Sequence, residues 1–170
     1  MIGSESGHTY FAYGSNLLRV RIETRVGSCV LHGRAELRGY RLSFSKLGKD
    51  GSGKCNIEAT GGDSDVVHGV LYGLEDAQRE ALDRFEGGYE YASVEVLLPG
   101  AERAVAMAAG TYVARPESIS RGAVPFDWYL GYVTAGAREQ GLPDAYLQWL
   151  ESHPLQSHAD VGRLIHHRHT

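Results

Sequence analysis

The stretch that organises this chain is Tyr10-Phe11-Ala12-Tyr13-Gly14-Ser15-Asn16. Its apolar, aromatic first half is typical of a buried strand, and Gly14 permits a tight turn. Ser15 and Asn16 are good helix caps, and a helical pattern follows from residue 17. A strand that turns into a helix N-terminus points several backbone N–H groups the same way. The stretch therefore predicts a site for an anion, or for an oxygen becoming one, with an ordinary strand–turn–helix junction as the alternative.

The segments on either side show strand and helix patterns without a strict βαβ rhythm. Strands are expected at residues 8–13, 39–45, 55–59, 66–74, 91–98 and 103–114, and helices at 17–25, 75–85, 126–140 and 144–151. Alternation of apolar and polar residues predicts the half-buried strands, and the nearly continuous apolar run at 66–74 predicts a central strand. Strands 91–98 and 103–114 flank a Pro-Gly turn and predict a hairpin. This arrangement favours an α+β fold.

The composition is that of an ordinary globular protein. The chain has 170 residues, of which 42% are hydrophobic and 22% charged, with a formal net charge of −4. We expect one domain over residues 1–170, with a core at about 8–152 and a polar C-terminal tail. The slight negative charge favours neither nucleic acid nor an anionic membrane as a partner. With only two cysteines, the protein is expected to be reduced. Residues 1–8 are polar and contain no signal-peptide core, which predicts a cytoplasmic protein.

Three other features suggest a function, but each has a simpler structural interpretation. Residues 48–55 (GKDGSGKC) nearly match a phosphate-binding loop, but Cys55 replaces the required Ser or Thr, so an exposed hairpin loop is the better interpretation. His166, His167 and His169 could bind a metal, although a solvated tail is favoured. Cys29 and Cys55 lack a surrounding motif and are expected to be small buried hydrophobes.

Glu86 is the strongest candidate for proton transfer. It follows an amphipathic helical pattern, where the negative end of the helix dipole disfavours a carboxylate, and Tyr89 and Tyr91 come soon after it. Desolvation by these aromatic rings would raise its pKa toward the range that a general base needs near neutral pH. A surface glutamate at a frayed helix end is the alternative.

Together these segments resemble the γ-glutamylcyclotransferase family over roughly residues 9–150. The resemblance rests on five quoted motifs in this order: residues 10–17 (YFAYGSNL), 69–74 (GVLYGL), 82–87 (LDRFEG), 110–113 (GTYV) and 129–146 with its Gly136-Ala137 and Gly141-Leu142-Pro143. Each motif is short, but their combination in this order is specific.

The resemblance implies an α+β fold around a small mixed or antiparallel β-barrel with flanking helices. It implies that a γ-glutamyl amide cyclises to 5-oxoproline and releases its amine. Glu86 would be the catalytic residue. The substrate-binding residues would be Tyr13, Gly14, Ser15, Asn16, Leu17, Tyr91, Tyr112 and Tyr129. The short linker between Glu86 and Tyr91 leaves the choice between Tyr89 and Tyr91 open.

The implied chemistry agrees with the residue-level predictions. The substrate's own α-amino group is the nucleophile, so the reaction requires no cofactor or metal. Glu86 would accept a proton from that amine and then donate one to the leaving nitrogen. Backbone N–H groups of residues 14–17 would stabilise the tetrahedral oxyanion, each typically by about 3 kcal/mol. The loop would then act through its backbone rather than through the Ser15 side chain.

Several alternatives stay open at this level. One is a cyclotransferase that removes a γ-glutamyl protecting group in secondary metabolism, or that acts on a γ-glutamyl-lysine type of amine. Another is a non-catalytic member of the fold that binds a small molecule, which the presence of Glu86 disfavours. Nucleotide binding through residues 48–54 is a third. The expected partner is a small γ-glutamyl substrate, without nucleic acid or membrane, and a homodimer is compatible with the sequence.

Overall fold

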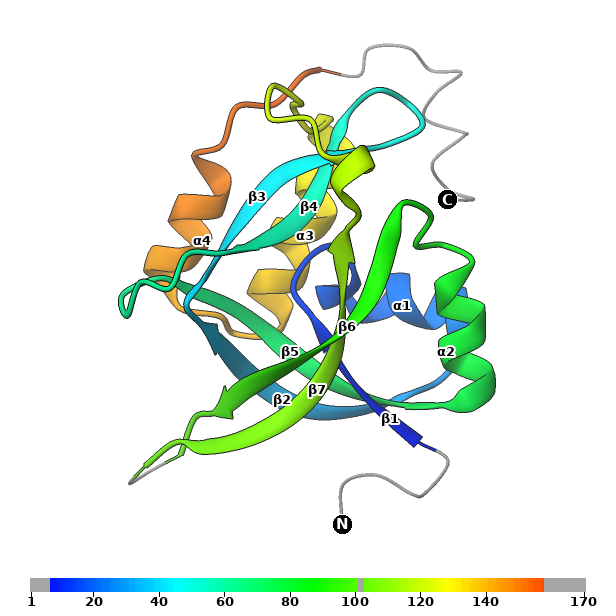
Figure 1. Cartoon of the computed structure of the whole chain (residues 1–170), viewed down its shortest axis with the longest axis vertical. Helices are drawn as coiled ribbons and strands as arrows, with labels where there is room; N and C mark the ends of the chain where they lie inside the picture. Colours follow the sequence, from blue (N-terminus) through cyan, green and yellow to red (C-terminus); the bar gives the residue numbers. More distant parts are fainter. Residues whose placement is uncertain (1–6, 101–102, 158–170) are drawn as a thin grey trace.

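A computed structural model describes residues 7–100 and 103–157, and its centre is a closed five-stranded barrel (Figure 1). In barrel order the strands are β1 (Gly7–Ala12), β5 (Val66–Glu75), β2 (Val30–Arg38), β6 (Tyr89–Leu98) and β7 (Val105–Ala114). All neighbours pair antiparallel except β1 and β7, which pair in parallel at Tyr10 and Gly110 and so close the barrel. The predicted α+β fold with a small mixed barrel is confirmed.

Strand β5 is largely buried, as its apolar run predicts. It pairs with β1 on one side and with β2 on the other. Val70, Leu71 and Tyr72 are completely buried, and Phe11 of β1 is buried with them. The hairpin predicted from the two later strands is also confirmed, because β6 and β7 pair along their full length.

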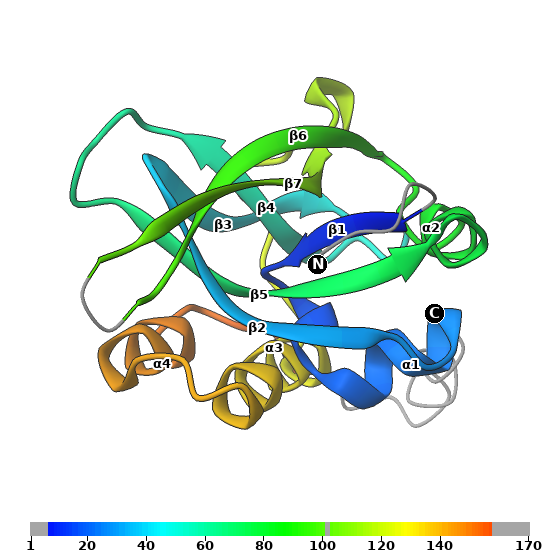
Figure 2. The ribbon, with the colours of Figure 1, turned by 90° about the horizontal axis from the view of Figure 1, so that it is seen from below.

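A two-stranded sheet lies outside the barrel and is made of β3 (Tyr40–Leu47) and β4 (Gly53–Ala59). The helices are α1 (Arg19–Val26), α2 (Asp76–Asp83), α3 (Asp127–Glu139) and α4 (Asp144–Glu151), with 3-10 turns η1 (Ser15–Leu17) and η2 (Pro116–Ser118). Figure 2 shows α1, α3 and α4 on one side of the barrel, below β2, whereas α2 lies beside the ends of β1 and β5. None of the described helices is both long and apolar enough to cross a membrane.

Helix α3 packs directly on the turn that follows β1. A Cβ atom added at Gly136 would lie 2.4 Å from the Leu18 amide nitrogen and 2.6 Å from the Leu17 Cβ. Only glycine allows the helix backbone to approach this closely. Gly136 therefore sets the position of the turn at residues 15–17.

The expected start of the first helix is wrong. Helix α1 begins at Arg19 with Leu18 as its N-cap, and neither Ser15 nor Asn16 caps it. Residues 15–17 form a 3-10 turn instead, because the Leu17 side chain is fully buried and the Ser15 and Asn16 side chains bond elsewhere. The predicted stop is confirmed, since Gly27 ends α1 with a φ of 85°. The three C-terminal histidines lie outside the described residues.

Candidate active site

A cavity of about 650 Å³ opens beside the turn that follows β1. Its walls come from the turn itself, from the β3–β4 hairpin, from the segment between α2 and β6 and from the start of α3, with further residues from β1, α1 and β7. Of the predicted site residues, the cavity is lined by Glu86, Tyr13, Gly14, Ser15, Asn16, Tyr112 and Tyr129. The tertiary fold thus brings together Glu86 and the turn, which are seventy residues apart in the chain.

Gly14 is required by a close approach rather than by a left-handed backbone. Its φ is −115°, and a Cβ atom added there would lie 3.0 Å from the Cβ of Cys55. That contact is tighter than ordinary packing allows, so a larger residue would push the turn away from β4. The turn is therefore held against the β3–β4 sheet on one side and against α3 on the other.

The turn supplies fewer free amide donors than the sequence suggests. The Leu17 N–H donates to the Gly14 carbonyl at 3.1 Å, and the Leu17 side chain points into the core, outside the cavity. Leu17 therefore cannot act as predicted. Within the described part of the chain, the amides of Ser15 and Asn16 have no hydrogen-bond acceptor. These two N–H groups are the available donors for an oxyanion.

The Ser15 side chain also has a contact that a purely backbone role does not explain. Its hydroxyl accepts a hydrogen bond from the Arg21 Nε at 2.9 Å, and the Arg21 guanidinium lies 4.6 Å from the ring centre of Tyr132. The hydroxyl thus helps to orient a cavity-lining arginine. That the loop acts through its backbone alone stays a prediction, and this contact gives the Ser15 hydroxyl a structural role beside it.

Glu86 lies just beyond α2, with its side chain 12% exposed. Its Oε1 is 3.4 Å from the Asn16 Nδ2 and 3.8 Å from the Arg25 Nη1. Burial raises the pKa of Glu86 to about 7, although Arg25, Lys46, Arg21 and the Asn16 hydrogen bond act to lower it. Helix α2 ends at Asp83, so desolvation rather than the helix dipole is the cause. A carboxyl with this pKa can both accept and donate a proton near neutral pH.

Asn16 joins Glu86 to two residues that sequence reasoning did not assign to the site. Its Nδ2 also donates to the Tyr10 hydroxyl at 3.0 Å, and its Oδ1 accepts from the Arg25 Nη1 at 3.3 Å. The Arg25 side chain is only 9% exposed. Its spacing of four from Arg21 on one helix face is a signal that could have identified both arginines.

The hydroxyl groups of three tyrosines in the cavity wall are hydrogen-bonded to backbone atoms. The Tyr13 hydroxyl donates to the Tyr112 carbonyl at 2.5 Å. The Cys55 N–H donates to the Tyr129 hydroxyl at 2.9 Å, and the Tyr89 hydroxyl donates to the Cys55 carbonyl at 2.6 Å. These bonds fix the rings in place, so the wall is rigid before a ligand binds.

Tyr89, and not Tyr91, lines the cavity. The two side chains project to the same side of β6, but Tyr91 lies one step farther along the strand, over Gly110 of β7. Its ring packs under the Arg79 guanidinium, 3.8 Å from the ring centre, and against Tyr112. The predicted assignment of Tyr91 to the cavity wall is therefore wrong. Tyr91 lies too far along β6 from Glu86 for its ring to reach the cavity.

Residues 48–52 join two strands, as a hairpin loop should, and no helix follows them. The context of a phosphate-binding loop is therefore missing. The expectation of a simple exposed loop is nevertheless incomplete, because Lys46, Asp50 and Lys54 all line the cavity. Cys55 is buried as predicted, and burial raises the pKa of its thiol to about 12. No group of three or more potential metal ligands occurs among the described residues.

Comparison with known proteins agrees with this architecture. Residues 66–150 match the AIG2-like family. Bovine γ-glutamylcyclotransferase is 31% identical over 84% of this chain and 77% of its own length, and the human γ-glutamylcyclotransferase is 30% identical over 87% and 79%. A solved γ-glutamyl cyclotransferase structure superposes with a TM-score of 0.79 at 26% identity, over 91% of this chain and 92% of that one.

The chain therefore belongs to the γ-glutamylcyclotransferase family. It is an enzyme with the general activity that gives the family its name. A non-catalytic binding protein, one of the alternatives left open by the sequence, is thereby set aside.

Proposed function

We propose that this enzyme cyclises a γ-glutamyl amide to 5-oxoproline and releases the amine, with Glu86 as the general base and acid. The observation that carries the proposal is the buried Glu86 carboxyl, which lines the same cavity as Ser15 and Asn16 with their free amides. The α-amino group of a substrate is mostly protonated at neutral pH, with a pKa of roughly 8. A carboxylate whose pKa is about 7 is well matched to accept that proton.

The proposed cyclisation needs only proton transfers and the exchange of one C–N bond for another, so it requires no cofactor. Glu86 takes a proton from the substrate's ammonium group, and the freed amine attacks the γ-carbonyl carbon. The new C–N bond closes a five-membered ring, and the carbonyl oxygen becomes an oxyanion that the Ser15 and Asn16 amides face. The oxyanion then collapses, and the amide C–N bond breaks as Glu86 gives its proton to the leaving nitrogen. The Glu86 carboxylate next takes the second proton from the ring nitrogen and passes it to the released amine, which leaves as an ammonium ion. Because the attack is intramolecular, much of the rate acceleration comes from holding the γ-glutamyl group of the substrate in the folded conformation that brings its amine to the carbonyl carbon.

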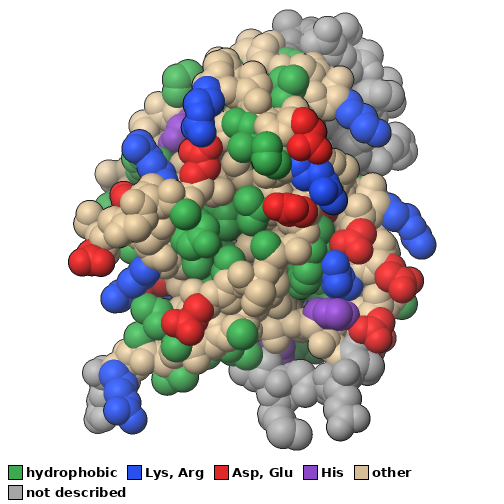
Figure 3. Space-filling view, in the orientation of Figure 1, with side chains coloured by type: hydrophobic (Ala, Val, Ile, Leu, Met, Phe, Trp, Pro, Cys, Tyr) green, Lys and Arg blue, Asp and Glu red, His purple; other side chains and the backbone are tan. Residues whose placement is uncertain are grey.

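The cavity favours a small molecule as the partner. Its wall is lined by aromatic rings and by several cations, which suit a γ-glutamyl group with its own carboxylate. On the face shown in Figure 3, basic and acidic side chains are interspersed around apolar ones. That mixture supports a small substrate rather than a nucleic acid, which would require a field of one sign.

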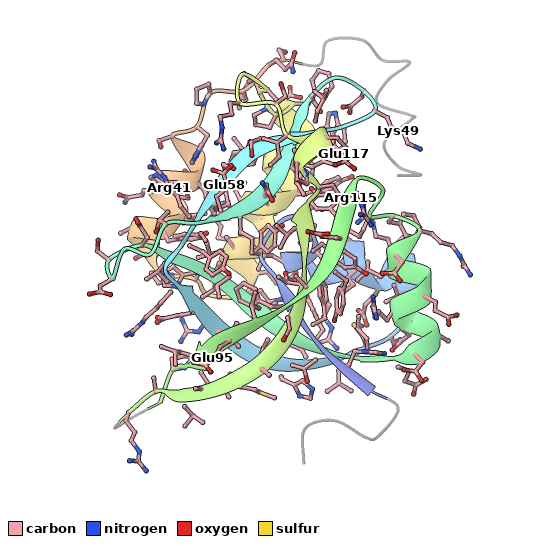
Figure 4. The ribbon with its side chains drawn as sticks, viewed as in Figure 1. Arg41, Lys49, Glu58, Glu95, Arg115 and Glu117 are labelled. Atoms are coloured by element: carbon pink, nitrogen blue, oxygen red, sulfur yellow. The ribbon has the colours of Figure 1, made fainter. Side chains whose placement is uncertain are left out.

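The test is the Glu86→Gln variant, which keeps the shape of the side chain but cannot accept a proton. We expect 5-oxoproline formation from γ-glutamyl-alanine to fall by about 100- to 10,000-fold, while the substrate still binds. Glu95→Gln is the matched control, because Glu95 is exposed on β6 and lies away from the cavity (Figure 4). Near-normal turnover by Glu86→Gln would overturn the assignment.

A further inference from the structure

Two lysines face each other where the β3–β4 hairpin meets the cavity. Lys46 of β3 and Lys54 of β4 are direct register partners, and both line the cavity. Like charges directly opposite each other on one face of a sheet destabilise it. An anion placed between the two ammonium groups would remove that cost.

Among the described residues, Lys46 has no carboxylate within ion-pair distance, although the charges of Glu86 and Asp50 act on it from farther away. The residue is only 8% exposed, and within the described part of the chain its ammonium makes neither an ion pair nor a hydrogen bond. Lys54 is better placed, with its Nζ 3.2 Å from the Asp50 Oδ2. Burial lowers the pKa of both lysines. An ammonium that lines a cavity without a close hydrogen-bond or ion-pair partner is available to an anionic group of a ligand.

Both ammonium groups are held against aromatic faces. The Lys46 Nζ lies 5.0 Å from the ring centre of Tyr89, and the Lys54 Nζ lies 4.6 Å from that of Tyr129. The two rings are themselves fixed by hydrogen bonds to the backbone of Cys55. The charges are thus positioned before a ligand arrives, which reduces the ordering that binding requires.

Gly88 brings Lys46 close to Glu86. A Cβ atom at position 88 would lie 2.8 Å from the Lys46 Cε, and the φ of Gly88 is 84°, so only glycine suits this position. The charge of Lys46 also acts on the Glu86 carboxyl. A leaving nitrogen that takes a proton from Glu86 therefore has its substituent within reach of Lys46.

We propose that Lys46 and Lys54 form a subsite for an acidic group on the released amine, so that they determine leaving-group specificity. This inference rests on the proposed function. Asp50 already accompanies Lys54, so Lys46 contributes most of the attraction. The enzyme then prefers a leaving group that carries a carboxylate over a neutral amine of the same shape.

The test compares two substrates that differ only in that charge, γ-glutamyl-alanine and γ-glutamyl-alaninamide, by their kcat/KM for 5-oxoproline formation. For a charge-assisted contact we expect the wild type to prefer the acid by about tenfold or more. Lys46→Met should lower this ratio toward one, because any effect through the Glu86 pKa acts on both substrates and cancels in the ratio, and Lys46→Arg should retain the preference. Arg41→Met is the matched control, since Arg41 is exposed on the same strand and lies beside Glu58, away from the cavity (Figure 4).

The outcomes separate this inference from the proposed function. A wild-type ratio near one, or a ratio unchanged in both Lys46→Met and Lys54→Met, overturns the subsite and leaves the cyclisation standing. Absence of 5-oxoproline from both substrates overturns the cyclisation and the subsite together. Lys54→Met gives a second reading if Lys46→Met does not fold, as judged by circular dichroism.

Discussion

Replacing Glu86 by glutamine should change how the stability of the folded protein depends on pH. In the folded state the pKa of Glu86 is about 7, against an ordinary value of 4.5. Between these values the folded carboxyl keeps a proton that the unfolded one has lost. The resulting stabilisation is therefore complete below a pH of about 4.5 and disappears as the pH rises through about 7.

The size of the effect follows from that difference in pKa. The gap is about 2.5 pH units, and each unit corresponds to about 1.4 kcal/mol, so the whole effect is about 3 kcal/mol. No large discount for solvent applies, because the side chain is only 12% exposed. Glutamine cannot titrate, so the variant lacks this dependence. Relative to Glu86→Gln, the wild type should lose most of about 3 kcal/mol between about pH 5 and pH 8.

Urea denaturation of both proteins at about pH 5 and pH 8 measures this double difference directly. All other titrating groups are common to the two proteins and cancel. Glu95→Gln, on the exposed face of β6, should show almost no double difference. A value near zero for Glu86→Gln, or one with the opposite sign, would show that burial does not raise the pKa of Glu86.

Two further predictions concern the surroundings of Glu86. Arg25→Gln should move the acidic limb of the kcat/KM profile to higher pH, because the Arg25 charge lowers the pKa of Glu86; an unshifted limb would contradict this. Gly136→Ala should destabilise the protein by about 1–3 kcal/mol in thermal denaturation, since its Cβ would overlap the backbone of Leu18 and the Cβ of Leu17. The same variant should also lower kcat, and an unaltered stability would show that α3 does not hold the turn.

The secondary structure was largely predictable because its signals are local. The apolar run of β5, the alternation in β3 and the Pro-Gly turn before β7 each lie within a few residues of the element that they define. The error at the start of α1 has a tertiary origin. Leu17 is drawn into the core beneath Gly136, and this burial outweighs the capping preference of Ser15 and Asn16.

The candidate site was predictable only in part. Glu86, Tyr112 and Tyr129 were placed by motifs that resemble a known family, and the structure brings all three to one cavity. The choice of Tyr91 failed, because only the packing of its ring over Gly110 shows that it lies too far along β6. The roles of Glu86, Tyr112 and Tyr129 in binding and catalysis stay predictions.

The cations around Glu86 show what only the tertiary structure could decide. Lys46 and Lys54 look like parts of an ordinary polar hairpin in the sequence, and Arg25 like a solvated helix residue. Strand register sets the two lysines opposite each other, and the packing of α1 against the turn brings Arg25 to Glu86. By itself the sequence predicted most of the elements, although not β2, and it indicated Glu86 as the candidate for proton transfer. Closure of the barrel decided how buried that carboxylate is and which charges surround it, and burial together with neighbouring charge sets its pKa.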